Sequence, residues 1–269
     1  MIEIDIDPVL QLGPVGINWY GFAMAMGIVS VIVLGIAEAK RVTKSMNIQF
    51  NLDATLFLIV WAIIGGVIGG RLFYIIDNWQ YYVSHPEAFI GLGYVRLIGV
   101  LAGAIAGVLL YVLLAKPDYE RLSIGQGADV IAPGAMLGIV LQRFGCFIRG
   151  CCYGIRSDLP WSVTYVNPMS AAPLGVSVHP VQMYHIIWNL LGFFLLWFMR
   201  GRFKRDGMLF LLWLAFYAAG DFGIRFLRDD QTFLLGLQQA QVMDIVLLVI
   251  TMLWLTFRIW QTNRTVDSQ

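Results

Sequence analysis

Seven apolar stretches constrain this chain more than any other feature, because each is about long enough to cross a bilayer. A helix that spans a membrane needs roughly 20 mostly apolar residues. The candidate spans are about Trp19–Ala39, Leu52–Ile76, Leu97–Ala115, Ala128–Phe147, Val181–Met199, Met208–Phe226 and Ala240–Trp260. Only 13% of the 269 residues are charged, about half the share of a soluble domain. The sequence therefore predicts an all-α, polytopic membrane protein with a single transmembrane domain over residues 1–269.

Basic residues in the connections predict the orientation of these spans. Eleven of them follow the first, third, fifth and seventh spans: Lys40, Arg41, Lys44, Lys116, Arg121, Arg200, Arg202, Lys204, Arg205, Arg258 and Arg264. Because basic loops stay in the cytoplasm, we expect the N-terminus outside and the C-terminus inside. The acidic N-terminal segment lacks the basic start of a signal peptide, so the first span is expected to be a permanent helix. A net charge of +1 gives nucleic-acid binding no support.

The other basic residues are all arginines, and all fall within spans or on the predicted outer side. They are Arg71, Arg96, Arg143, Arg149, Arg156, Arg225 and Arg228. The planar guanidinium group suits bidentate contact with phosphate or carboxylate. Ionisable groups inside a membrane protein are candidates for function. Two interpretations stay open: some of these arginines meet a lipid phosphate, or they pair with Asp129, Asp221 or backbone carbonyl groups.

Two segments depart from a simple bundle of spans. The fourth span contains Pro133 and Arg143, which predicts a helix that is kinked or half-buried among its neighbours. The outer loop at about 148–179 is too long for a turn, and such loops often carry substrate contacts. Glycines recur every three or four residues in the second and third spans, a spacing that favours close packing of helix backbones.

Several motifs in a fixed order cover nearly the full length of the chain. They are DPVLQLGPVGINWYG (Asp7–Gly21), IIGGVIGGRLFY (Ile63–Tyr74), GADVIAP (Gly127–Pro133), RFGCFIRGCCYG (Arg143–Gly154), DLPWSV (Asp158–Val163), HPVQMY (His179–Tyr184) and a Y…R…R segment (Tyr217–Arg228). In order and spacing the chain resembles the prolipoprotein diacylglyceryl transferase family. HPVQMY and the RFG…G stretch are the most specific pieces. Seven spans with an outer N-terminus also fit this family.

The resemblance implies an enzyme of the bacterial cytoplasmic (inner) membrane. Members of the family take the diacylglyceryl group of phosphatidylglycerol and attach it to the thiol of the lipobox cysteine in a preprolipoprotein. A thioether forms and glycerol phosphate leaves. The implied partners are phosphatidylglycerol, the lipobox segment and the lipid bilayer, with no cofactor and no metal. Such a reaction needs fixed positive charge for the phosphodiester and a proton acceptor for the thiol.

Carried over residue by residue, the resemblance implies a set of site residues. The catalytic candidates are Tyr20, Arg143, His179 and Tyr217. The substrate-binding candidates are Arg71, Cys146, Arg149, Gly154, Gln182, Tyr184, Asp221, Arg225 and Arg228. Alternatives remain open for three of them. His179 is a proton acceptor or a structural histidine of the long loop, and Tyr20 and Tyr217 are site residues or members of an interfacial aromatic belt.

The chain also departs from the family pattern. The usual signature reads R-x-G-N-F-x-N, often with an acidic residue two places later; here Cys146, Arg149 and Cys151 stand at those three positions. Ile98 stands where many members carry histidine or tyrosine, which removes one proposed base. In the C-terminal motif the family carries an arginine and a glutamate four residues apart, and this chain has Asp221 and Arg225 at those positions. Residues four apart share a helix face, so we expect an ion pair with reversed polarity. His185 stands where glutamate is common.

The three cysteines, Cys146, Cys151 and Cys152, admit three interpretations. A zinc site would need a fourth ligand such as His179 or His185, and adjacent cysteines are not expected to reach one tetrahedral ion easily. A redox or acyl-carrying thiol, or a disulfide, fits an oxidising outer side. Small buried thiols packed beside Arg143 are the third interpretation.

Two other function classes remain as rivals to the lipid transferase. A thiol-redox membrane enzyme on the same scaffold would lose activity on alkylation of its cysteines, and a paralogue would use another acceptor or lipid. A transporter ranks last, because the polar residues crowd toward the outer side and do not form a file across the membrane.

Overall fold

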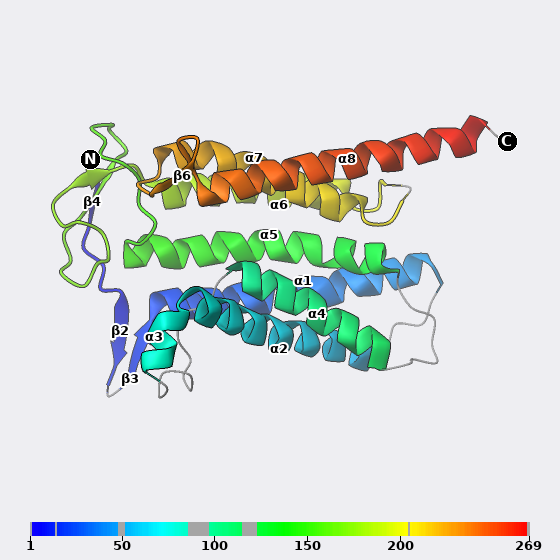
Figure 1. Ribbon diagram of the computed structural model, residues 1–269, viewed down its shortest axis with the longest axis horizontal. Coiled ribbons are helices and arrows are strands. Elements are labelled where there is room, and N and C mark those ends of the chain that lie inside the picture. Colours follow the sequence, from blue (N-terminus) through cyan, green and yellow to red (C-terminus); the bar gives the residue numbers. More distant parts are fainter. Residues whose placement is uncertain are drawn as a thin grey trace. The chain divides into compact units, whose positions relative to one another are not determined.

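The computed structural model describes residues 2–13, 15–47, 52–85, 97–114, 123–203 and 205–267. The chain is mostly helical (Figure 1). The long helices are α1 (Trp19–Ser45), α2 (Leu52–Asp77), α4 (Leu97–Leu114), α5 (Ile124–Arg149), α6 (Val181–Met199), α7 (Met208–Ile224) and α8 (Gln239–Asp267). The short helical elements are α3 (Trp79–Ser84) and η2 (Arg225–Leu227).

The helices confirm the predicted class, an all-α polytopic membrane protein. Among the described residues, six helices are long and apolar enough to cross a membrane, namely α1, α2, α5, α6, α7 and α8. Helix α4 adds an apolar helix of 18 residues at the position of the third predicted span. The count of seven spans and their orientation remain predictions, and Ala115, Lys116, Arg121, Arg96 and Lys204 lie outside the described residues.

The chain divides into two compact units, residues 43–121 and the remainder. Within the 43–121 unit, α2 and α4 pack against each other through glycines. A Cβ atom on Gly69 would lie 2.7 Å from the Cα atom of Gly103, so a larger residue would force the two backbones apart. The guanidinium group of Arg71, on α2, lies 5.4 Å from the ring centre of Tyr82, on α3. The glycine spacing of the second and third spans therefore serves close packing.

The other unit contains α1 and α5 to α8, and α5 is its most buried candidate span. This helix begins with a capping box, in which Ser123 and Gln126 each satisfy the other's backbone N–H. It continues through Pro133 as one element and ends at Gly150, whose φ of 75° is the left-handed conformation typical of helix ends. The fourth predicted span is thus a complete helix, and its Arg143 is buried.

The loop at 148–179 forms a small structured cap. Its strands β4 (Val163–Tyr165) and β5 (Ser177–Val178) pair with β1 (Ile2–Ile4) in the order β1-β4-β5, with β1 and β4 parallel. Tyr165 is buried in this sheet, and its hydroxyl donates to the carbonyl oxygen of Phe147 at 2.8 Å. That bond ties the cap to the end of α5. Two hairpins, β2 (Val9–Leu12) with β3 (Val15–Asn18) and β6 (Thr232–Leu234) with β7 (Leu237–Gln238), complete the strands.

Polar contacts stabilise the end of α1 and the start of α7. Glu38, near the end of α1, lies 3.7 Å from Arg200 and also pairs with Arg41. The basic residues in the last turns of α1 and those that follow α6 therefore share one end of this unit, as the charge pattern predicts. Asp129 accepts hydrogen bonds from the backbone N–H groups of Gly207 and Phe210, both at 2.8 Å. Asp129 thus stabilises the start of α7.

Candidate functional site

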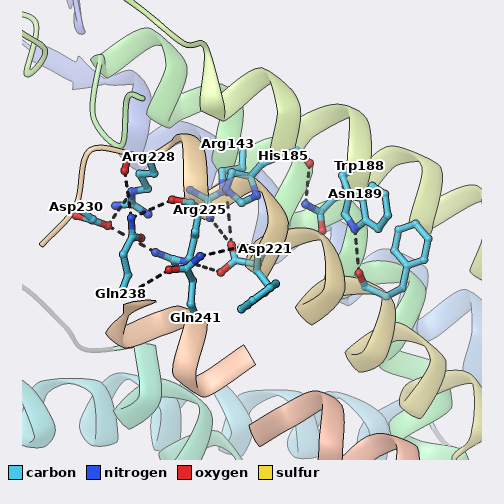
Figure 2. A network of polar contacts seen from close by, with 12 residues as sticks. Arg143, His185, Trp188, Asn189, Asp221, Arg225, Arg228, Asp230, Gln238 and Gln241 are labelled. Carbon is cyan, nitrogen blue, oxygen red and sulfur yellow. Dashed lines mark hydrogen bonds and ion pairs between the residues drawn. The ribbon is translucent and has the colours of Figure 1, made fainter. Parts of the chain in front are cut away.

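The centre of the candidate site is Asp221, a carboxylate on α7 at the middle of the polar network in Figure 2. Its side chain is buried, with 2% exposed. Its Oδ2 atom accepts a hydrogen bond from Nε of Arg225 at 2.5 Å, one helical turn later. Its Oδ1 atom lies 3.7 Å from Nε2 of His185, on α6, and 3.9 Å from a guanidinium nitrogen of Arg143, on α5. Three helices therefore converge on one buried carboxylate. The expected Asp221–Arg225 ion pair of reversed polarity is present.

Several polar atoms around this carboxylate have no hydrogen-bond partner among the described residues. They are Nε of Arg143, both ring nitrogens of His185 and Oδ1 of Asp221. Buried polar groups are nearly always hydrogen-bonded, because an unmade bond costs roughly 1–3 kcal/mol. The cluster is therefore suited to receive a polar ligand or water that completes these bonds. In the sequence His185 was noted as a departure from the family and as a possible zinc ligand, and its burial against Asp221 adds it to the candidate site.

The β6–β7 hairpin and the start of α8 hold the arginines of this site in place. Asp230 lies 3.6 Å from Arg225 and 3.0 Å from Arg228. Gln238 donates to the carbonyl oxygens of Arg225 and Arg228, and Gln241 donates to that of Phe222. Sequence reasoning missed Asp230, Gln238 and Gln241. The available signal was a pair of glutamines at the start of an otherwise apolar span.

The three cysteines come together where α5 ends. Their sulfur atoms all lie within 4.8 Å of one another. Cys146 lies in the last turn of α5 and is buried, while Cys151 and Cys152 are half-buried free thiols. Cys152 has a φ of 62°, in the left-handed region. The expectation that adjacent cysteines would not reach one point is therefore wrong, because this unusual backbone conformation accompanies side chains that converge.

The pKa values of the two thiols beyond the helix are shifted in opposite directions. Hydrogen bonds from Cys146 and Cys151, with the charges of Arg228 and Arg143, lower the pKa of Cys152 despite its burial. A hydrogen bond with Cys146 lowers the pKa of Cys151, but a bond to Cys152 and burial outweigh it and raise that pKa to about 11. These surroundings therefore favour the thiolate form of Cys152 over that of Cys151.

Tyr20 and Arg149 lie beside the cysteines. The guanidinium carbon of Arg149 is 5.5 Å from the ring centre of Tyr20, a cation–π distance. Tyr20 also neighbours Gln142 and the three cysteines. Tyr217, one turn before Asp221 on α7, is within electrostatic range of both Arg143 and Asp221. The structure thus brings Tyr20, Cys146 and Arg149 together, and Tyr217 joins the Asp221 network.

The HPVQMY motif links the cap to this site. The hydroxyl of Tyr184 hydrogen-bonds Nδ1 of His179 at 3.1 Å and accepts from Nε1 of Trp161 at 2.9 Å. Gln182 is fully buried and donates to the carbonyl oxygen of Cys151 at 2.7 Å. Sequence reasoning did not assign Trp161, although an aromatic residue in a long loop was a visible signal. These bonds fix the motif against the loop that carries two of the cysteines.

Gly154 lies where the cap, the motif and the arginines meet. Its N–H donates to the carbonyl oxygen of His179 at 3.0 Å, and it bridges to Arg228 as an isolated β pair. A Cβ atom there would lie 2.5 Å from the carbonyl oxygen of Leu227 and 2.6 Å from Cβ of His179. Only glycine fits this junction without moving the backbone.

We expect Gly154→Ala to destabilise the protein by about 1–3 kcal/mol, the usual cost of overpacking, and to displace Arg228. Thermal unfolding of the purified protein in detergent measures the effect. Gly127→Ala is the matched control, because no heavy atom lies within 4 Å of a Cβ atom at that helical position. An alanine at 154 that leaves the melting temperature unchanged would show that the junction is not tightly packed.

Arg71 is the one predicted site residue in the 43–121 unit, and its assignment to the site stays a prediction. The other twelve lie in the unit that contains α5 to α8. Arg96 lies outside the described residues, and nothing is described of the Ile98 side chain.

Comparison with known proteins decides the family. A family profile described as prolipoprotein diacylglyceryl transferase matches residues 8–257 of the chain. The chain belongs to the prolipoprotein diacylglyceryl transferase family. A Dehalococcoides mccartyi protein named phosphatidylglycerol–prolipoprotein diacylglyceryl transferase is 36% identical over 259 residues, which cover 96% of both chains. A Lysinibacillus sphaericus protein of the same name is 29% identical, over 93% of this chain and 91% of its own.

Membership of the diacylglyceryl transferase family gives the cysteine cluster and the Asp221 network a common setting. Both are built on the end of α5, which carries the family signature from Arg143 to Gly154. Three positions where this transferase departs from the expected signature, Cys146, Arg149 and Cys151, lie in or beside the cysteine cluster.

Proposed function

We propose that this protein transfers the diacylglyceryl group of phosphatidylglycerol to the thiol of the lipobox cysteine in a preprolipoprotein. The C–S bond of a thioether forms, the C–O bond to phosphate breaks, and glycerol phosphate leaves. Membership of the family and the names of its relatives support this reaction. The proposed location is the bacterial cytoplasmic membrane, with the site on its outer side. The bilayer then supplies the lipid directly.

The observation that carries the proposal is the buried Arg143. A guanidinium group in a largely apolar chain is costly unless its charge is matched. A guanidinium nitrogen of Arg143 lies 3.9 Å from the Asp221 carboxylate, which Arg225 already binds at 2.5 Å. The Nε atom of Arg143 has no hydrogen-bond partner among the described residues. Arg143 thus keeps a buried hydrogen-bond donor available for an anion. A phosphodiester headgroup supplies that anion and accepts bidentate hydrogen bonds.

The remaining predicted residues take supporting roles in this proposal. Arg228 and Arg225 add positive charge around the phosphate, and Tyr217 lies within electrostatic range of Arg143. His179 and Tyr20 are the candidate groups that handle the acceptor's proton. The other proposed substrate-binding residues are Arg71, Cys146, Arg149, Gly154, Gln182 and Tyr184.

The decisive experiment is complementation of a strain depleted of its own diacylglyceryl transferase. We expect the chain to restore growth, and mass spectrometry to find a diacylglyceryl group on the N-terminal cysteine of a reporter lipoprotein. A reporter whose lipobox cysteine is replaced by serine is the matched control and must remain unmodified. A wild-type reporter that stays unmodified, although the protein is present in the membrane, would refute the proposed reaction.

A further inference from the structure

The trithiol cluster, Cys146 with Cys151 and Cys152, has the geometry of a metal site. Within the described part of the chain it is the one group of three or more His, Cys, Asp or Glu side chains whose ligand atoms converge. Its sulfur atoms lie within 4.8 Å of one another. Sulfur ligands of a tetrahedral zinc ion are about 3.8 Å apart, as follows from Zn–S bonds of about 2.3 Å. Small side-chain rotations therefore suffice to bind an ion.

The surroundings of the trithiol cluster suit bound thiolates. Nε2 of Gln142 lies 3.5 Å from Sγ of Cys146 as a hydrogen-bond donor. Arg143, Arg149 and Arg228 act electrostatically on the half-buried thiols. Three thiolates around a divalent cation carry one net negative charge, which these guanidinium groups offset. Outer hydrogen-bond donors of this kind orient metal ligands in proteins.

The trithiol cluster is only partly buried. Cys146 forms its buried side, whereas Cys151 and Cys152 are half-buried. Zinc prefers four ligands, and sites with three protein ligands keep the fourth position for water or substrate. A thiol that coordinates such an ion loses its proton. Metal coordination is therefore a way to activate a sulfur nucleophile.

The proposed reaction needs this property, because its acceptor is a cysteine thiol that must become a thiolate. Soft thiolate ligands select zinc or copper(I). Copper(I) is satisfied by three sulfur atoms, while zinc leaves room for a fourth, which favours zinc for a site that must bind a substrate thiol.

We propose that Cys146, Cys151 and Cys152 bind a zinc ion whose fourth position takes the acceptor cysteine as its thiolate. The inference rests on the proposed function. The acceptor's S–H proton leaves to solvent or to the departing phosphate, and its sulfur lone pair forms the C–S bond to the glyceryl carbon. The electron pair of the broken C–O bond goes to the phosphate oxygen of glycerol phosphate. No oxidant or reductant takes part.

The test measures zinc and its coordination apart from activity. The full-length protein is purified in detergent with reductant, loaded with zinc, dialysed and analysed by plasma mass spectrometry. We expect about one zinc ion per chain, and at least a roughly tenfold loss in each of C146S, C151S and C152S. H85A is the matched control: His85 is an exposed histidine outside the cluster, and its loss should leave the zinc content unchanged.

Cobalt(II) in place of zinc reports the ligands directly. We expect a near-ultraviolet sulfur-to-cobalt band that strengthens when a lipobox peptide is added, and no change with the same peptide carrying serine for cysteine. Absence of zinc from the reduced wild-type protein, equal zinc in the serine variants, or no response to the cysteine peptide overturns the inference.

Lipid transfer measured on the same samples separates the two proposals. If the triple serine variant lacks zinc but transfers lipid normally, the zinc inference falls and the proposed function stands. If zinc-loaded wild type binds the thiol peptide but transfers no lipid, the proposed function falls and the metal site stands.

Discussion

Arg143→Gln is expected to reduce lipid transfer by about 10²–10³-fold, the usual effect of removing one preorganised charge from a transition state. Glutamine keeps some hydrogen bonding but removes the positive charge that the leaving phosphate needs. The measurement is transfer from labelled phosphatidylglycerol to a lipobox peptide in membranes. Arg143→Lys keeps the charge and loses the planar fork, so an intermediate rate is expected.

Stability distinguishes this effect from misfolding. Asp221 keeps its 2.5 Å partner Arg225 when Arg143 is replaced, so the buried carboxylate is not left without a cation. We therefore expect Arg143→Gln to unfold within a few degrees of wild type. Arg202→Gln, which removes an exposed arginine at the other end of the unit, is the charge-matched control and should retain full activity. Normal turnover by Arg143→Gln would reject the role of this residue.

Asp221→Asn is expected to destabilise the protein by about 3–5 kcal/mol, because it removes the carboxylate that faces the buried Arg143 and lies nearest to the half-buried Arg225. A loss of that size corresponds to a fall of roughly 10 °C in the melting temperature. Both Arg225 and Arg143 face this carboxylate, and Asp221 is 2% exposed. Solvent therefore cannot compensate for the missing charge. Thermal unfolding in detergent provides the measurement.

Exchanging the charges of Asp221 and Arg225 tests whether Asp221 stabilises the protein through more than one partner. Asp221→Arg with Arg225→Glu restores the usual family order, but it places a second arginine beside Arg143. We expect this double variant to be as unstable as Asp221→Asn. Adding His185→Glu supplies an acid at the position 3.7 Å from Asp221, so the triple variant should recover most of the lost stability. A stable double variant would mean that only the Asp221–Arg225 pair matters.

The spans could be predicted from the sequence because of the physics of the bilayer. A chain in lipid must satisfy its backbone hydrogen bonds within each segment, so about 20 apolar residues already imply a helix. The same argument holds for the fourth span, where Pro133 did not prevent a helix from Ile124 to Arg149. The reversed ion pair was also predictable, because residues four apart on a helix face each other.

The site itself depended on contacts between distant parts of the chain. His185 was visible as a departure from the family, but only the packing of α6 against α7 places it by Asp221. Gln238 of β7 and Asp230, which lies just before β6, reach the arginines through loops whose course no local pattern specifies. The cap also depends on contacts between distant parts of the chain, because β1 pairs in parallel with β4, a strand about 160 residues later.

The sequence by itself determined the membrane-spanning helices, the charge asymmetry of their connections and the family motifs, since each depends on local composition and spacing. Only the tertiary structure decided that three thiols meet at one point and that Asp221 joins three helices. The reason is that these arrangements depend on one backbone conformation at Cys152 and on helix packing, and neither is encoded in a short stretch of residues.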